Sequence, residues 1–329
     1  MDVLIFSANA VLPIILLVLL GWALKKIKLF TPEFLRVGNK LTFNVLLPVL
    51  LFNNVYAIGS FSSINWAFVL YSIIAVIVIF LVSIPICIWF TKENGQRGVL
   101  IQAIFRSNYA IIGIPLATQL FGSEGAAAAS VLSAFTIPVY NALAVITLSI
   151  FNGKNEKGKI NVGKILLGIV KNPLILGVAA GLLVLGIRAI FEATGVTFRL
   201  SQISFLQTTL NYIGSTATPL ALLVLGGQFE FSAISKLKKH IIFGTAMRTV
   251  VVPALGLGVA YLIFGNFGGQ YYASLIALFG TPVAVSSAIM AREMDCDGDL
   301  AGQLVVWTTI FSSITLFLTI AIFRFAGIF

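Results

Sequence analysis

The sequence predicts an all-α membrane protein whose ten transmembrane helices form two inverted repeats of five helices. The composition supports this, because 59% of the 329 residues are hydrophobic and only 10% are charged, and the mean hydropathy is +1.05. Such a chain has too few polar side chains to cover a soluble domain. Its apolar residues form about ten segments long enough to cross a bilayer, and similar strings recur in the two halves.

Each expected span follows from a run of about 20 apolar residues. The first run is a retained span and not a signal peptide, because Asp2 stands where a basic region would be and no cleavage pattern comes before Lys25. The expected spans, each bounded by the ends of its apolar run, are 3–24, 34–56, 65–90, 97–121, 125–151, 163–187, 202–228, 240–264, 270–290 and 300–328.

The loops between these spans alternate in charge, which predicts the orientation. The loops at 57–64, 121–125 and 264–270 contain no Lys or Arg. Arg188 and Arg199, between spans six and seven, are exceptions. The basic residues that give the net charge of +10 lie in the other loops and not in one stripe, so the charge does not indicate nucleic-acid binding. We therefore expect a multi-pass protein of the cell membrane with both termini extracytoplasmic. The basic residues of the cytoplasmic loops are Lys25, Lys26, Lys28, Arg36, Lys40, Lys92, Arg97, Lys154, Lys157, Lys159, Lys164, Lys236, Lys238, Lys239 and Arg292.

An internal repeat divides the chain at a polar segment. The string GQRGVLIQAIFRSNYA from Gly95 aligns with GQYYASLIALFGTPVA from Gly269, and LLPVLLF from Leu46 aligns with ATPLALL from Ala217. We expect a first repeat at 1–151, a short cytoplasmic linker at 152–162 and a second repeat at 163–329. Because each half has an odd number of spans, the second half is expected to lie inverted in the membrane.

Prolines at matched positions predict that helices four and nine are broken and cross at mid-membrane. The fourth span holds Asn108, Gly113 and Pro115, and the ninth holds Thr281 and Pro282. Proline removes a backbone donor and clashes with the preceding turn, and a broken helix offers free N–H groups and a positive dipole end to an anion. The alternative is that both prolines only kink their helices, since other spans also contain proline.

Two arginines, Arg106 and Arg248, fall inside spans, whereas every acidic residue falls at a span end or in a loop. An uncompensated buried cation favours an anionic substrate; the alternative is that both side chains snorkel to the membrane surface. Asn44 and Asn141 lie near span prolines and complete the candidate site. The lack of a mid-span acid argues against a carboxylate proton relay or sodium site, which favours uniport or coupling through hydroxyls and carbonyls.

Other functional classes find little support. An intramembrane protease would need two mid-span aspartates or a Ser with a His base, and His240 lies at a loop boundary. Cys87 and Cys296 form no CxxC pair, so we expect no metal site, no cofactor and no enzyme activity. A channel or a ligand-sensing receptor for a carboxylate remains the alternative to a carrier, because either can use broken helices around a polar cavity.

At these residues the chain resembles the auxin efflux carrier family, which includes plant auxin exporters and bacterial permeases associated with malate and malonate. The resemblance rests on Asn108 with the GIPL string at Gly113, on Pro282 with the downstream string from Ala291 to Glu293, and on Asn172 with Pro173. It implies a scaffold of spans one, two, six and seven that forms a homodimer. It also implies an elevator-like movement of the other spans, with a carboxylate bound near Asn108 and the crossing prolines.

Two departures from the plant exporters refine this expectation. The third span, read from Ile64, lacks the acid and the lysine that support transport in the plant proteins, and the linker is short. Both favour a compact carboxylate carrier of the bacterial type. Arg106 would add a second positive contact, which suits a dicarboxylate such as malate or malonate better than a bulky, auxin-like monocarboxylate.

Overall fold

The computed structural model describes residues 2–56, 65–152, 167, 171, 173–195, 198–228, 231–265 and 267–328. Nearly all of these residues are helical, and they include no strand beyond one isolated β-bridge. By length and composition, five helices within these described ranges are able to cross a membrane. The chain is therefore a helical membrane protein, as predicted. These five spans are Pro32–Asn53, Trp66–Phe90, Val131–Ile150, Ile234–Phe264 and Gly298–Phe325.

Helices in the first half occupy the positions that the apolar runs predict. Thr31 caps the second expected span, where its side chain accepts from the Phe34 N–H at 3.2 Å, and Asn65 caps the third in the same way. The turn between spans four and five falls at Phe121 and Gly122. The elements are α1 (Asp2–Lys26), α2 (Pro32–Leu41), η1 (Thr42–Leu46), α3 (Leu47–Tyr56), α4 (Trp66–Phe90), α5 (Asn94–Phe105), η2 (Tyr109–Gly113) and α6 (Ile114–Ile150).

The second half follows the expected spans less closely: the helix expected from 240 begins at Phe231, and the helix expected to end at 187 continues to Ala193. Asp297 caps the last helix by accepting from the Leu300 N–H at 2.9 Å. The linker expected at 152–162 lies outside the described residues, apart from Asn152. The elements are α8 (Pro173–Ala193), η3 (Leu200–Gln202), α9 (Ser204–Gln228), α10 (Phe231–Ala246), η4 (Met247–Val251), α11 (Val252–Phe264), α12 (Gly269–Gly280), α13 (Val285–Glu293) and α14 (Gly298–Phe325).

Three π-turns, η1, η2 and η4, each end two residues before a proline, at Pro48, Pro115 and Pro253. Proline has no N–H for the carbonyl four residues earlier and crowds that turn. The wider turn accommodates this, because the residue just before each proline donates its N–H five residues back, as Ile114 does to the Tyr109 carbonyl. Pro115 therefore does not break its helix, contrary to expectation. The break lies upstream, at residues 106–108.

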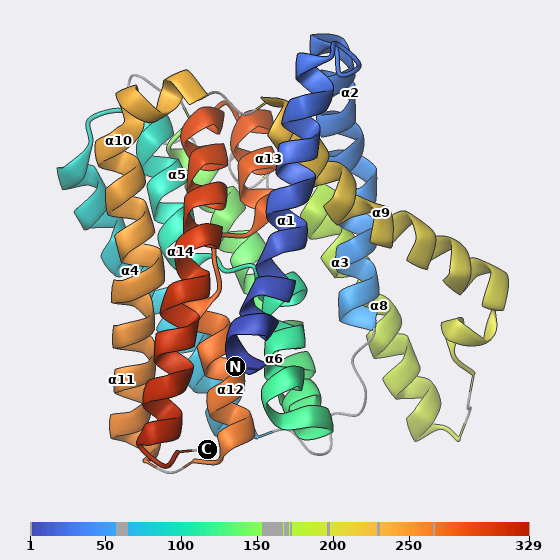
Figure 1. Ribbon diagram of the computed structural model, residues 1–329. Helices are drawn as coiled ribbons and strands as arrows, with labels where there is room; N and C mark the ends of the chain where they lie inside the picture. Colours follow the sequence, from blue (N-terminus) through green and yellow to red (C-terminus); the bar gives the residue numbers. More distant parts are fainter. Residues whose placement is uncertain are drawn as a thin grey trace.

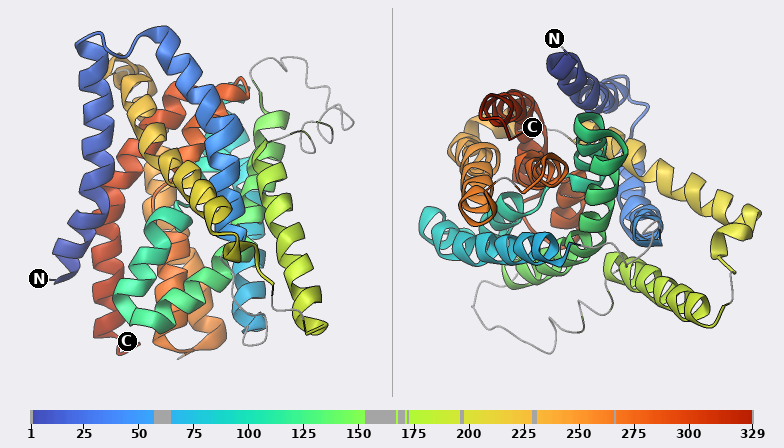
Figure 2. Two further views of the ribbon diagram at one scale, coloured as in Figure 1. Left: turned by 90° about the vertical axis from the view of Figure 1, so that its right-hand side faces the viewer. Right: turned by 90° about the horizontal axis from the view of Figure 1, so that it is seen from below.

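The helices gather into two neighbouring groups. In one group, α1 packs on α9, and α3 packs on both α8 and α9. Gly21 and Gly226 make the α1–α9 contact possible, since a Cβ atom at either would collide with the backbone of the opposite helix. Figures 1 and 2 show α8 and part of α9 projecting beside the main bundle, and both chain termini in the lower half of the Figure 1 view.

The second group surrounds the two half-helices α5 and α12. Every residue of α12 from Tyr272 to Gly280 is buried, and so is every residue of α5 from Gly98 to Phe105. Helices α4, α6, α11 and α14 pack around them. The inner ends of both half-helices consequently lie inside the protein, away from water and lipid.

Candidate binding site at the crossing of two broken helices

Two short extended segments cross where α5 and α12 end. Ser107 and Val283 form an antiparallel β-bridge, and the Asn108 N–H donates to the Pro282 carbonyl at 2.8 Å. The Val283 N–H donates to Thr308 Oγ1 at 3.1 Å. The breaks in the fourth and ninth expected spans therefore do meet, and the Pro282 carbonyl and the Thr308 hydroxyl accept from N–H groups at the two breaks.

A cavity of about 60 Å³ lies beside this crossing. Its polar side comes from the extended segment 106–108, from the middle of α6 and from the start of α13. Its apolar wall comes from Leu47, Leu50 and Leu51 of α3 and from Ala221 of α9. The cavity thus lies between the crossing and the α1–α3–α8–α9 group.

The Arg106 guanidinium lines this cavity and is 4% exposed. It donates to Asn141 Oδ1 and to Ser286 Oγ, each at 2.8 Å, and to Met290 Sδ at 2.6 Å. In the described part of the chain no carboxylate lies within ion-pair distance of it. Neutral acceptors hold its position but leave its charge uncompensated, and such a charge attracts an anion. Arg106 does not snorkel to the membrane surface.

Asn108 contributes an unused donor beside the cavity. Its side chain is 4% exposed, and its Nδ2 atom is buried without a hydrogen-bond partner. A buried donor left without a partner costs about 1–3 kcal/mol. An oxygen atom of a bound ligand would remove that cost. The structure therefore brings together three of the expected site residues, namely Arg106, Asn108 and Asn141.

Thr281, Pro282, Gly113 and Asn44 are not among the described residues that line the cavity. Thr281 donates its hydroxyl to the Ala277 carbonyl at 2.8 Å, and Pro282 acts only through its backbone carbonyl. Gly113 is a packing residue, because a Cβ atom there would meet the Tyr109 ring. Asn44 is exposed and donates to the Lys40 carbonyl at 2.9 Å. Of Pro115 the structure describes only the backbone, which is helical.

Sequence reasoning missed several polar residues of the cavity. Ser107, Tyr140 and Ser286 line it, and Ser107 donates to the Tyr140 hydroxyl at 3.2 Å. Thr218, from α9, lines the cavity too. The signal available for Ser286 was the Ser-Ser pair directly after the break in the ninth span. Nothing in the local sequence distinguishes Tyr140 from a core tyrosine.

Arg248 lies at the same crossing but not in the cavity lining. It is fully buried, and its guanidinium donates to three backbone carbonyls: Thr281 at 2.9 Å, Leu278 at 3.0 Å and Ile104 at 3.1 Å. The expectation that Arg248 snorkels is therefore wrong. The broken helices provide acceptors for its charge inside the protein, which makes an approach to the surface unnecessary.

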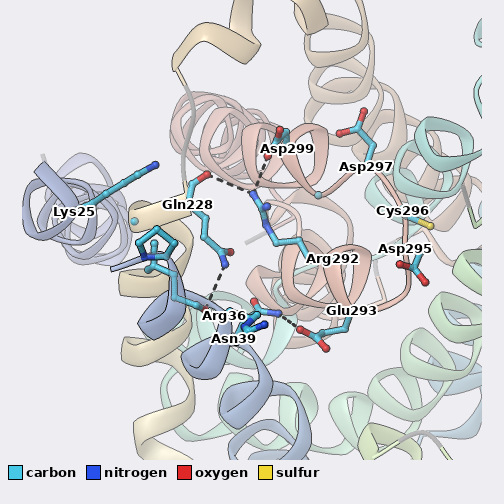
Figure 3. Close-up of a pocket in the computed structure, with 14 residues that line it drawn as sticks. Lys25, Arg36, Asn39, Gln228, Arg292, Glu293, Asp295, Cys296, Asp297 and Asp299 are labelled. Atoms are coloured by element: carbon cyan, nitrogen blue, oxygen red, sulfur yellow. Dashed lines mark hydrogen bonds and ion pairs between the residues drawn. The ribbon is translucent and has the colours of Figure 1, made fainter. Parts of the chain in front are cut away.

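A larger polar vestibule, of about 930 Å³, opens between the junction of α1 and α2, the end of α9, and the segment from α13 to α14 (Figure 3). Asn39 Nδ2 donates to Glu293 Oε1 at 2.6 Å across it. Arg292 Nη2 donates to Asp299 Oδ1 at 3.0 Å and to the Gln228 carbonyl at 3.5 Å. These contacts join the α1–α3–α8–α9 side of the molecule to the helix that leaves the crossing.

Cys296 lines the vestibule, and its half-buried thiol contacts the end of α6. It donates to the Phe151 carbonyl at 3.6 Å and to the Leu148 carbonyl at 3.7 Å. Burial, with a smaller effect of the Asp295 and Asp297 carboxylates, raises the pKa of Cys296 to about 12. The group is therefore a neutral thiol at physiological pH.

Residues 6–320 match the family model described as membrane transport protein. The chain belongs to this family. The match confirms the resemblance to the auxin efflux carriers. Together with the apolar helices, membership of the membrane transport protein family makes the chain a multi-pass membrane transporter.

Two archaeal relatives are similar along nearly their whole length. An uncharacterized transporter of Methanothermobacter thermautotrophicus is 25% identical over 313 residues, which cover 94% of this chain and 96% of the relative. An uncharacterized transporter of Methanocaldococcus jannaschii is 25% identical over 308 residues, which cover 92% and 94% of the two chains. The similarity of these membrane transport proteins thus extends across both broken helices and the segment that joins the two halves.

Proposed function

We propose that this chain is a secondary transporter of a small organic anion, with a carboxylate as the group it recognises. One observation carries the proposal: a small cavity at the crossing is lined by Arg106, which has no carboxylate within ion-pair distance in the described part of the chain, and by Asn108, whose amide nitrogen has no partner. A carboxylate supplies a negative charge to compensate Arg106 and an acceptor oxygen for the Asn108 amide nitrogen. Binding therefore removes two unfavourable features of the empty site at once.

The shape of the cavity narrows the substrate. A volume of about 60 Å³ favours a compact acid over a bulky aromatic one. Malonate and malate carry two carboxylates, of which one would contact Arg106 and the other the Asn108 amide and the hydroxyls of Ser107 and Tyr140. A dicarboxylate is therefore the preferred class, and an auxin-like acid is the less favoured one.

The proposed architecture is ten spans in two inverted repeats. Its support is the correspondence of the half-helices: α5 and α12 have 12 residues each, and both end at the crossing. In this arrangement both termini are extracytoplasmic, because the loops rich in Lys and Arg then face the cytoplasm. The repeats occupy 1–151 and 163–329.

The proposed mechanism is an elevator-type alternating access. The α1–α3–α8–α9 group, which corresponds to spans one, two, six and seven, would stay fixed and form the homodimer. The crossing and its substrate would move against the wall formed by α3 and α9. The cavity lies between the two groups of helices, which supports this mechanism. In an elevator movement the substrate travels with the moving group and slides away from the wall of the fixed group.

Counterflow in proteoliposomes tests the function. Purified protein is reconstituted with unlabelled malate or malonate inside, and uptake of the labelled acid is followed with and without a proton gradient, beside indole-3-acetate. We expect saturable dicarboxylate exchange that Asn108→Ala abolishes and that the matched variant Asn44→Ala, outside the cavity, leaves unchanged. A channel would give flux without counterflow. A receptor would bind the acid without flux, and either result would contradict the proposal.

A further inference from the structure

Arg248 binds the inner ends of both broken helices. Its guanidinium contacts the Ile104 carbonyl in the last turn of α5, the Leu278 carbonyl in the last turn of α12, and the Thr281 carbonyl just beyond α12. The side chain comes from a third element, the π-turn η4 between α10 and α11. One side chain therefore ties three helices together at a buried point.

The carbonyls that Arg248 binds are those that the breaks leave without donors. In a continuous helix the Ile104 carbonyl would accept from the Asn108 N–H, but that N–H donates to Pro282 instead. The Leu278 carbonyl would accept from residue 282, which is a proline and has no N–H. Arg248 supplies the missing donors with the planar fork that only arginine has.

The charges at this point also balance. Each helix C-terminus carries the equivalent of roughly half a negative charge, so the two ends together approach the single positive charge of the guanidinium. In the described part of the chain no carboxylate lies within ion-pair distance of Arg248. The partial negative charges of the two helix ends thus compensate the positive charge of Arg248, and the guanidinium in turn compensates theirs.

In transporters with broken helices, half-helix C-terminal ends and unwound carbonyls are the groups that coordinate a coupling sodium ion. We propose that Arg248 is a built-in cation that occupies this carbonyl site permanently, so that transport by this chain needs no sodium ion. Removal of the side chain would leave three converging carbonyls, which form a site for a small monovalent cation. Arg248 is on this view a positioning residue: it holds the crossing on which Arg106 and Asn108 depend, without touching the substrate.

Two measurements test the inference, and only one rests on the proposed carrier function. The first is the melting temperature of the purified protein in sodium, potassium and choline chloride, and in choline with millimolar guanidinium. We expect equal values for the wild type in all four. For Arg248→Ala we expect a value several degrees lower in choline, raised again by guanidinium and by sodium. This readout needs no substrate, so it stands even if the chain carries no carboxylate.

The second measurement is dicarboxylate counterflow in the same salts. The wild type is expected to be independent of the cation, whereas Arg248→Ala loses about tenfold or more in choline and recovers activity with guanidinium or sodium. The matched control is Arg188→Ala, which removes an arginine far from the crossing in sequence and is expected to respond to neither cation. A merely structural loss at Arg248 would not be reversed by a small cation.

Arg248→Lys keeps the inference testable if the alanine variant does not fold. It retains the charge but not the fork, so we expect lower stability with no dependence on sodium. Sodium dependence of the wild type or of Arg248→Lys would overturn the inference. So would an Arg248→Ala protein that matches the wild type in stability and activity and responds to no cation.

Discussion

Arg106 and Arg248 are both buried at the crossing, yet their surroundings give them different roles. Arg106 donates to an amide oxygen, a hydroxyl and a thioether, which are neutral groups that leave its charge available. Arg248 donates to three carbonyls at helix ends, which compensate its charge. The anion is therefore expected to bind at Arg106.

Arg106→Gln is expected to weaken dicarboxylate binding far more than it destabilises the protein. Hydrogen bonds to charged groups contribute about 1.5–3 kcal/mol, so the KM for malate counterflow should rise by roughly tenfold to a hundredfold. Arg106→Lys, which keeps the charge but loses the fork, should show an intermediate rise. The control is Arg36→Gln, which alters a cation of the vestibule only. Unchanged dicarboxylate binding in Arg106→Gln would show that Arg106 does not contact a carboxylate of the substrate.

Cys296 is expected to react slowly with maleimides at neutral pH. A pKa of about 12, against about 8.5 for a free thiol, makes the reactive thiolate roughly a thousandfold scarcer. Because the neutral form persists until the pH approaches that pKa, labelling should accelerate about tenfold per pH unit across the alkaline range. Mass spectrometry of the intact protein measures the rate, with Cys296→Ser as the blank. Rapid labelling at pH 7 would show that the thiol is not buried against the end of α6.

At the scale of the elements, prolines and glycines decide how the helices meet. A proline two residues after a π-turn leaves a helix continuous, as at Pro115, whereas Pro282 lies within the extended segment that crosses Ser107. Glycines of α1 and α9 bring two backbones into contact. Local chemistry of the same kind thus produces a bend, a break or a close crossing according to what surrounds it.

Pro115→Ala and Pro282→Ala are expected to differ sharply. The break at residues 106–108 is fixed by the Asn108–Pro282 hydrogen bond and by Arg248, so Pro115→Ala should retain most of the counterflow activity. Pro282→Ala introduces an N–H that competes with Arg248 for the Leu278 carbonyl, and transport should fall. Equal loss in both variants would mean that Pro115 also defines the break.

Gly226→Ala is expected to destabilise the contact between α1 and α9. Its new methyl group would meet the backbone at Val18, and a backbone cannot yield as a side chain can. Gly258→Ala in α11 is the matched control, because nothing lies within 4 Å of its Cβ position; it should be neutral or stabilise by roughly 0.5–1 kcal/mol. Melting temperatures of the two purified variants make the comparison. Equal values would argue against a close helix crossing.

At the scale of the whole molecule, two groups of helices meet at the cavity and at the vestibule. Two hydrogen bonds span the vestibule, from Asn39 to the Glu293 carboxylate and from Arg292 to the Gln228 carbonyl, and each contributes about 1.5–3 kcal/mol. An apolar wall faces the cavity on the other side. Such an interface suits parts that slide, because it has few specific contacts to break.

A thiol cross-link across the vestibule tests this movement. In a background of Cys87→Ala and Cys296→Ser, cysteines replace Asn39 and Glu293, whose side chains are in contact. A short bifunctional thiol reagent should join them and stop counterflow, and reductive cleavage of the linker should restore it. Each single-cysteine protein treated in the same way is the control. Full transport by the cross-linked protein would contradict a movement of α13 relative to α2.

Much of the fold can be predicted from the sequence because each membrane span must satisfy its own backbone and present apolar side chains to lipid. Both requirements are local, so the apolar runs predict most of the described helices to within a few residues, although α10 begins nine residues early and α8 ends six residues late. Pro282 lies in the crossing itself, whereas Pro115 lies seven residues beyond the break at 106–108. The sequence also predicts Asn108, Arg106 and Asn141 as site residues, because a polar group in the middle of a span is costly and is usually functional.

The tertiary structure alone decided which polar groups have which partners. Arg106 and Arg248 look alike in the sequence, but one reaches a cavity and the other reaches carbonyls of residues 30 or more positions away. Asn44 and Thr281 have the right chemistry but find acceptors in their own helices, whereas Tyr140 and Ser286 reach the cavity from helices that meet only on folding. Composition and periodicity determined that this chain crosses a membrane, because burial in lipid is a property of each segment. The binding site could be identified only in the folded chain, because a hydrogen-bond partner depends on two residues that folding brings together.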